Sequence, residues 1–269
     1  MTLDFLIAVF FFFIGLEITT TLSHPKQILL PTIAALGGMI FPAVIFLLLD
    51  SQSGGWATAM PTDLALALGV FALLGRKANP AARLFLLTLA VADDLFSLIV
   101  LALFYSKDLD LIHSSTTLGA AALGAIFASI PKLPTKRLIA LLSPLCTFVI
   151  IPVYVISKLA EGISFSDLTS KTTTALVIAR IVGKILGISL FAWLVLRMHI
   201  ATLPNELHFS EIVGVSALAG MGLTVSLVIS EVAVASESVQ SQIRAGLIIS
   251  ALISGVIGYL WLRKIPAAK

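Results

Sequence analysis

Three acidic residues lie in the middle of segments that are otherwise apolar enough to cross a lipid bilayer. Asp93 and Asp94 are adjacent in the run 84–105, and Asp63 lies in the run 58–75. An ionised aspartate at the centre of a bilayer costs about 2.5–3.5 kcal/mol on insertion scales, and two adjacent ones repel each other. Packing alone does not justify such a penalty. The pair therefore indicates a cation or proton site inside the membrane.

Basic residues are expected to accompany these acids. Lys184 lies in the middle of the apolar run 172–197, and Arg180 lies one turn before it. Adjacent residues of a helix point about 100° apart, so Asp93 and Asp94 cannot both face one partner. We expect one aspartate to line a cavity and the other to pair with a cation on a neighbouring helix, for which Lys184 is the best candidate. Arg180 could instead carry its charge along its long stem to the membrane surface.

Composition excludes several protein classes. The chain has 269 residues, 59% hydrophobic and 12% charged, and a soluble domain carries about twice that share of charge. We expect residues 1–269 to form a single transmembrane transporter domain, because no loop is long enough for a soluble domain. The only cysteine, Cys146, excludes an internal disulfide and a cysteine-based metal cluster. The net charge of +3 is no sign of nucleic-acid binding.

Nine apolar runs are long enough to cross a bilayer as helices. They cover residues 3–22, 28–49, 58–75, 82–105, 114–130, 138–157, 172–197, 211–234 and 243–262. The loops on one side carry eleven Lys and Arg residues and those on the other side carry four. This bias predicts a cytoplasmic C-terminus. With nine spans the N-terminus is then outside, which suggests that an N-terminal helix is missing.

Two of these runs are expected to be interrupted helices, because polar and helix-breaking residues lie at mid-depth in both. They are Pro61, Thr62 and Asp63 in the run 58–75, and Gly220, Gly222, Thr224 and Ser226 in the run 211–234. A broken helix exposes backbone groups, which is tolerated only where protein or water satisfies them. A matched pair of interrupted spans in the two halves of a chain indicates a transporter binding site.

Local motifs along the chain resemble those of the NhaA family of bacterial Na⁺/H⁺ antiporters. They are Ala8–Glu17, Gly37–Pro42, Gly55–Ala57 with Thr62–Val70, Asp93-Asp94, Leu101–Tyr105, Gly183–Phe191, Gly220–Ser226 and Gly258–Arg263. They follow the family order over nearly the whole chain. The resemblance implies an all-α polytopic membrane fold of inverted repeats, in which two interrupted helices cross near the midplane. It also implies exchange of cytoplasmic Na⁺ or Li⁺ for external protons across the bacterial inner membrane.

The resemblance further implies a role for individual residues. Asp94 resembles the ion-binding carboxylate, and Asp93 resembles the carboxylate that pairs with the helix lysine, here Lys184. Both aspartates are expected to hold Na⁺ and to carry protons. Asp63 resembles the residue that offsets the partial positive ends of the interrupted helices, so Asp63 and Lys184 are expected to compensate charge. The supporting residues are expected to be Thr62, Gly220, Gly222 and Thr224. No cofactor is implied beyond the transported ions Na⁺, Li⁺ and H⁺.

The chain also departs from the family pattern. Family members typically have twelve spans, and two family helices are missing between Tyr105 and Thr116. The first family helix and its β-hairpin, used in dimer contact, are missing too, so a homodimer remains only an open alternative. After Lys136-Arg137 the family has a glutamate linked to pH regulation, where this chain has Leu138. We expect transport without the ordinary pH activation of the family.

Three other interpretations stay open. An intramembrane aspartyl protease would need facing carboxylates such as Asp63 and Asp94, but its glycine–aspartate motif is absent and Asp93 has no place in it. A degenerate, transport-inactive homologue is favoured by the reduced number of spans and opposed by the intact acids and Lys184. The acids and the lysine could also form a buried ion pair that only fixes helix register. We expect no enzyme activity.

Overall fold

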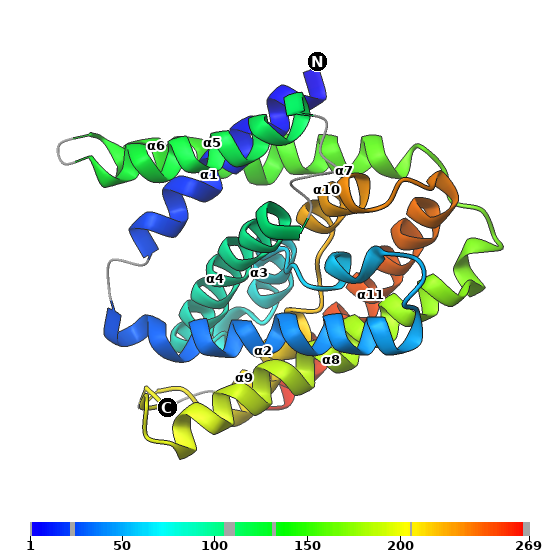
Figure 1. Ribbon diagram of the computed structural model, residues 1–269. Coiled ribbons are helices and arrows are strands. Elements are labelled where there is room, and N and C mark those ends of the chain that lie inside the picture. The colour runs from blue at the N-terminus through cyan, green and yellow to red at the C-terminus, as the bar shows by residue number, and fades with distance from the viewer. Residues whose placement is uncertain (1, 22–24, 105–110, 131–132, 205, 266–269) are drawn as a thin grey trace. The chain divides into compact units, whose positions relative to one another are not determined.

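The computed structural model describes residues 1–269 except 1, 22–24, 105–110, 131–132, 205 and 266–269 (Figure 1). The described residues form helices and connecting loops without a strand, which confirms the expected all-α fold. Their contacts divide the chain into two compact units. The first is Met1–Pro25 with Leu98–Gly162, and the second is Lys26–Ser97 with Ile163–Lys269. That the two units act as a single transporter domain stays a prediction.

The first unit is built around closely packed helices. It contains α1 (Thr2–Thr21), α5 (Leu111–Ser129), α6 (Thr135–Leu145), η3 (Cys146–Ile150) and α7 (Ile151–Leu159). Gly15 of α1 lies against the backbone of Ala121, and Gly124 of α5 lies against the backbone of Phe12, so a larger side chain at either glycine would clash. The rings of Phe12 and Phe127 pack edge to face with centroids 6.1 Å apart. Small residues thus let α1 and α5 approach closely.

One predicted span of this unit contains an irregular turn. The run 138–157 lies within the continuous helical stretch Thr135–Leu159, which confirms the predicted helix. Between α6 and α7 the turn Cys146–Ile150 is a π-helix. Pro144 lies just before it, and proline removes one backbone donor from the helical ladder. A wider turn is one way for a helix to absorb such an interruption.

The second unit contains both interrupted helices that the sequence predicts. Its elements are α2 (Pro25–Leu49), η1 (Gly55–Ala59), α3 (Leu64–Ala72), η2 (Gly75–Lys77), most of α4 (Pro80–Phe104), η4 (Asp167–Thr169), α8 (Lys171–Arg197), α9 (Phe209–Leu218), α10 (Thr224–Ala233) and α11 (Glu237–Lys264). The predicted span 58–75 corresponds to η1 and α3, separated by residues 60–63. The predicted span 211–234 corresponds to α9 and α10, separated by residues 219–223.

Side-chain caps fix where several of these helices begin. The carboxylate of Asp63 accepts from the backbone N–H of Leu66 at 3.3 Å and so caps α3. The Ser170 hydroxyl caps α8 by accepting from the Thr173 N–H at 3.1 Å. Short polar side chains at this position satisfy backbone donors that have no partner inside the helix. The start of the helix that carries Asp63 is therefore set by the same residue that we expect to compensate charge.

Glycines bring α2 and α8 into close contact, and Figure 1 shows the two helices side by side. A methyl group on either Gly37 or Gly187 would clash with the carbonyl oxygen of the other. A methyl group on Gly183 would lie 2.7 Å from the Cα of Pro42. This close approach is possible because Gly183 and Gly187 carry no side chain. It fixes the position of Lys184, which lies between these two glycines.

Several helices are long and strongly apolar. Among the described residues, five helices are long and apolar enough to cross a membrane: Ile28–Leu49, Pro80–Phe104, Thr135–Leu159, Lys171–Arg197 and Glu237–Lys264. In the second unit, a buried core joins Phe71 of α3, Leu89 of α4, Ile188 of α8, Ile212 of α9 and Leu262 of α11. The interrupted helices are thus packed in protein, as their irregular backbone requires.

Candidate ion-binding site at the helix crossing

The two interrupted helices meet at their breaks. The backbone N–H of Asp63 donates to the carbonyl of Met221 at 2.7 Å. The hydroxyl of Thr62 lies 2.9 Å from the carbonyl of Ala219. These bonds hold residues 60–63 against residues 219–223. Backbone carbonyls in one break thus receive hydrogen bonds from residues of the other break.

Asp63 lies between two helix N-termini. Its carboxylate accepts from the Leu66 N–H of α3 at 3.3 Å and from the Thr224 N–H of α10 at 3.4 Å. The Thr224 hydroxyl also donates to it. Helix N-termini carry partial positive charge, and a carboxylate at that position is favourable. The geometry fits the role that the resemblance implies for Asp63, which stays a prediction.

Asp93 and Lys184 form a fully buried ion pair. The Lys184 Nζ lies 2.7 Å from the Asp93 Oδ2, and neither side chain has any exposed surface. The Thr62 hydroxyl lies 2.6 Å from the same carboxylate oxygen and 3.0 Å from the Nζ. The pairing expected between one aspartate of α4 and Lys184 of α8 is therefore present. Removing either partner would leave an uncompensated charge in the interior.

Asp94 and Ser97 complete the polar surface of α4 near this pair. Asp94 is half-buried, whereas Asp93 is fully buried. Ser97 follows Asp93 by four residues, which places both on one face of the helix. Within the described part of the chain, neither the Ser97 hydroxyl nor the Asp93 Oδ1 has a hydrogen-bond partner, although both are buried. Oxygens of this kind suit a hard cation such as Na⁺. We did not single out Ser97 from the sequence, although its spacing from Asp93 was a usable signal.

Comparison with known proteins shows which family the chain belongs to. A family model described as Na⁺/H⁺ antiporter 1 matches residues 1–133 and 127–262. The chain belongs to this family. The membership expected from the motifs is confirmed, and the chain is a multi-pass helical membrane protein.

Several curated relatives are similar to the chain over most of their length. The Na(+)/H(+) antiporter NhaA of Citrobacter koseri is 33% identical, and the match covers 97% of this chain and 82% of the relative. The protein of the same name from Salmonella typhimurium is 32% identical over the same shares. The Na(+)/H(+) antiporter NhaA 1 of Klebsiella pneumoniae is 33% identical over 97% of this chain and 80% of its own length.

In this member of the Na⁺/H⁺ antiporter 1 family, Arg180 belongs to the crossing. The suggestion that its stem carries the charge to the membrane surface is wrong, because Arg180 has no exposed surface. Its guanidinium donates instead to three backbone carbonyls and one hydroxyl of the interrupted segments. Sequence reasoning missed this role, since the spacing to Lys184 does not reveal which carbonyls lie opposite.

The expected supporting residues all lie at the crossing. Thr62 contacts the Asp93–Lys184 pair, and Thr224 binds Asp63. Gly220 accepts a hydrogen bond through its carbonyl, and its Cα faces the hydroxyl of Ser254. Gly222 packs so tightly that a methyl group there would clash. The structure thus brings together all eight residues expected at the site, while their roles in transport stay predictions.

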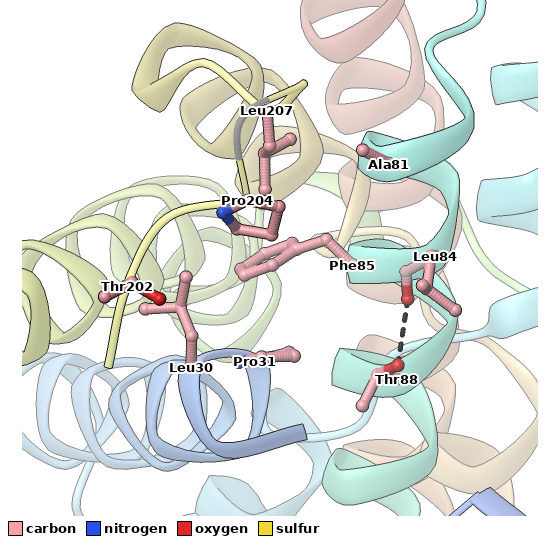
Figure 2. A pocket seen from close by; sticks show the side chains of 9 residues that line it. All are labelled: Leu30, Pro31, Ala81, Leu84, Phe85, Thr88, Thr202, Pro204 and Leu207. Carbon is pink, nitrogen blue, oxygen red and sulfur yellow. Dashed lines mark hydrogen bonds between the residues drawn. The ribbon is translucent and has the colours of Figure 1, made fainter. Parts of the chain in front are cut away.

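A separate cavity in the second unit is apolar. It has a volume of about 300 Å³ and lies between α2, α4 and the segment before α9. Figure 2 shows the Phe85 ring extending from α4 toward Pro204. The Thr88 hydroxyl is already bonded to the Leu84 carbonyl at 2.9 Å. Among the described residues that line this cavity none is charged, so we do not place ion binding there.

Proposed function

We propose that the chain is a secondary antiporter that exchanges cytoplasmic Na⁺ or Li⁺ for external protons at Asp93 and Asp94. The observation that carries this function is the fully buried Asp93–Lys184 pair, with Asp94 beside it, at the crossing of two interrupted helices. Membership of a family of Na⁺/H⁺ antiporters supports it. A buried ion pair whose only role was to fix the register of two helices would not need to lie where two interrupted helices meet.

In the proposed mechanism Na⁺ and protons compete for the same carboxylates. Asp94 supplies the principal charge for the cation, while the Asp93 Oδ1 and the Thr62 hydroxyl offer further oxygen ligands. Each carboxylate that binds Na⁺ must first be free of its proton, so one species replaces the other. Exchange then requires two conformations of the protein that open this site to opposite sides of the membrane.

The orientation follows from the charge of the loops. The excess of Lys and Arg on one side supports a cytoplasmic C-terminus in the bacterial inner membrane. The crossing then lies between the two aqueous compartments. Na⁺ leaves the cytoplasm as protons enter.

Flux measurements in everted membrane vesicles test the function. The vesicles come from a bacterial strain without its own Na⁺/H⁺ antiporters and contain the full chain or no added protein. We expect added Na⁺ or Li⁺ to dissipate a preformed pH gradient only when the chain is present. A chain that is inserted in the membrane but gives no cation-dependent flux at any pH would support the transport-inactive alternative.

Competition can be tested separately by varying pH and Na⁺ together. Below the pH at which the carboxylates titrate, each unit decrease should raise the apparent Kd for Na⁺ about tenfold per competing proton. Saturating Na⁺ should therefore restore most of the flux that is lost in acid. An acid-side loss that saturating Na⁺ does not restore would indicate a separate pH gate, contrary to the expected loss of ordinary pH activation.

A further inference from the structure

The crossing contains backbone carbonyls of η1 and of the two breaks that accept hydrogen bonds from a side chain of another helix. η1 ends at Ala59 and α9 ends at Leu218. The last carbonyls of a helix have no donor within it, and they carry partial negative charge. Inside the membrane such backbone groups are tolerated only where protein or water satisfies them, and donors from another helix are one way to do so.

Arg180 supplies donors to both interrupted helices at once. It donates through Nη1 to the carbonyl of Thr58 at 2.7 Å and through Nη2 to that of Pro61 at 2.7 Å. Its Nε donates to the carbonyl of Gly220 at 3.2 Å, and Nη1 also lies 3.0 Å from the Ser226 hydroxyl. A planar guanidinium has five N–H donors in a fixed geometry, whereas a lysine ammonium is a compact point charge. The arrangement therefore requires arginine in particular.

Gly222 makes room for this guanidinium. A methyl group at Gly222 would clash with the Arg180 Nη2 and with the Pro61 carbonyl oxygen. The backbone of the second interrupted helix thus approaches both the donor and the acceptor of one hydrogen bond. The glycine that the family resemblance singles out has a specific structural reason here.

Lys184 lies one turn after Arg180 on α8 and has different partners. Its Nζ donates to Asp93 and to the hydroxyl of Thr62. That hydroxyl lies 2.9 Å from the carbonyl of Ala219, at the end of α9. The Thr62 hydroxyl thus lies between Lys184 and the Ala219 carbonyl. The next carbonyl along the chain, that of Gly220, accepts from Arg180.

We infer that Arg180 is a positioning residue for ion exchange, which binds carbonyls of η1 and of the breaks that follow η1 and α9 and so leaves Lys184 to pair with Asp93. This inference rests on the proposed antiport. A guanidinium keeps its charge throughout the physiological pH range, whereas a buried ammonium can give up its proton. The helix ends thus stay compensated by a fixed charge while the Asp93–Lys184 pair exchanges ions and protons.

Replacing Arg180 should change the pH dependence of exchange as well as stability. Without the guanidinium, Lys184 is drawn toward the uncompensated carbonyls and away from Asp93. Asp93 then loses its cation, which favours its neutral form and lets protons compete with Na⁺ at higher pH. In Arg180→Gln we expect the acid-side midpoint of Na⁺-dependent flux to move up by about one pH unit, with about a tenfold rise in the KM for Na⁺ at fixed pH. Arg180→Lys keeps the charge but loses the planar set of donors, so it should restore only part of this shift.

The experiment compares these variants with Arg197→Gln in everted vesicles, after matching the amount of inserted protein. Arg197 is exposed at the end of the same helix and stacks on Trp193, so its variant should keep the wild-type pH profile. Absence of wild-type flux would overturn the antiport function itself. Given wild-type flux, an unchanged midpoint and KM in Arg180→Gln would overturn the positioning role, even if the melting temperature fell.

A second variant covers the case in which Arg180→Gln does not insert. Gly222→Ala keeps every charge but forces the guanidinium away from Pro61. It should shift the midpoint in the same direction, and the shift should be smaller in an Arg180→Lys background. Equal shifts in both backgrounds would show that Gly222 acts independently of Arg180, which would contradict the inference.

Discussion

Two pairs of opposite charges lie at the same crossing, but they are held in different ways. Asp93 and Lys184 contact each other directly. Asp63 instead binds backbone amides at the start of α3 and α10, and Arg180 binds carbonyls of η1 and of the breaks that follow η1 and α9. Charges that neutralise each other can be exchanged for a proton or a cation. Charges bound to helix ends cannot leave without exposing backbone groups. The first pair is suited to transport and the second to holding the crossing in place.

The largest effect is expected at Asp94, which belongs to neither pair. Asp94→Asn keeps the size of the side chain but removes its negative charge and its titratable proton. We expect no Na⁺-dependent proton flux in everted vesicles at any pH. Asp50→Asn is the control, because Asp50 is a buried aspartate that accepts from the Thr172 hydroxyl at 2.7 Å and lies outside the crossing. Clear flux in Asp94→Asn would exclude it as the essential ion ligand.

The Asp93–Lys184 pair should show strong energetic coupling. Lys184→Ala leaves Asp93 buried without its cation, and breaking such a pair costs about 3–5 kcal/mol. Adding Asp93→Asn removes the stranded charge and should restore part of the loss. A double-mutant cycle of unfolding free energies in detergent measures this coupling. Additive effects would show that the two charges stabilise the protein independently.

Asp63 should affect stability and rate more than ion affinity. Asp63→Asn keeps an acceptor for the helix N-termini but removes the charge, which should cost about 1–2 kcal/mol. We expect a lower melting temperature and a lower maximal flux, with little change in the KM for Na⁺ or in the pH midpoint. A large shift of the pH midpoint would place Asp63 among the exchanging charges and remove the distinction between the two pairs.

Features that depend on local pattern could be predicted from the sequence. Apolar runs predicted the positions of the five long apolar helices, and Pro61 and Gly220 marked the two breaks. The pairing of Lys184 with an aspartate of α4 followed because two charges buried at similar depth need each other. The contacts of Arg180 could not be predicted, since they depend on which carbonyls of distant segments face α8. The spacing of Ser97 from Asp93 could be read from the sequence, but that its hydroxyl lacks a hydrogen-bond partner among the described residues depends on the neighbours of α4.

The smallest effect is expected at Asp167, where a carboxylate is held by hydroxyl and amide donors outside the spans. The Ser241 hydroxyl at 2.6 Å, and after it the Ser164 N–H at 2.9 Å, hold the pKa of Asp167 below its ordinary value. A lowered pKa in the folded state stabilises the protein above the unfolded value of about 3.9, and this contribution is lost as pH falls through the folded pKa. Asp167→Asn should therefore lower the melting temperature slightly near neutral pH.

The difference between wild type and Asp167→Asn should shrink only below about pH 4. There the carboxylate of the unfolded chain takes up a proton, while the folded one, with its lowered pKa, keeps its charge to lower pH. Melting temperatures of the purified protein in detergent, measured from neutral to acidic pH, check this expectation. Flux should stay at the wild-type level, since the Asp167 carboxylate accepts from Ser164 and Ser241, which lie outside the crossing. A difference that persisted unchanged in strong acid would mean that the amide, rather than the lost charge, causes the destabilisation. The donors around Asp167 would then stabilise the protein whether or not the side chain is charged. Asp63 is held by the same kinds of donor, so its assignment as a compensating charge would be weakened.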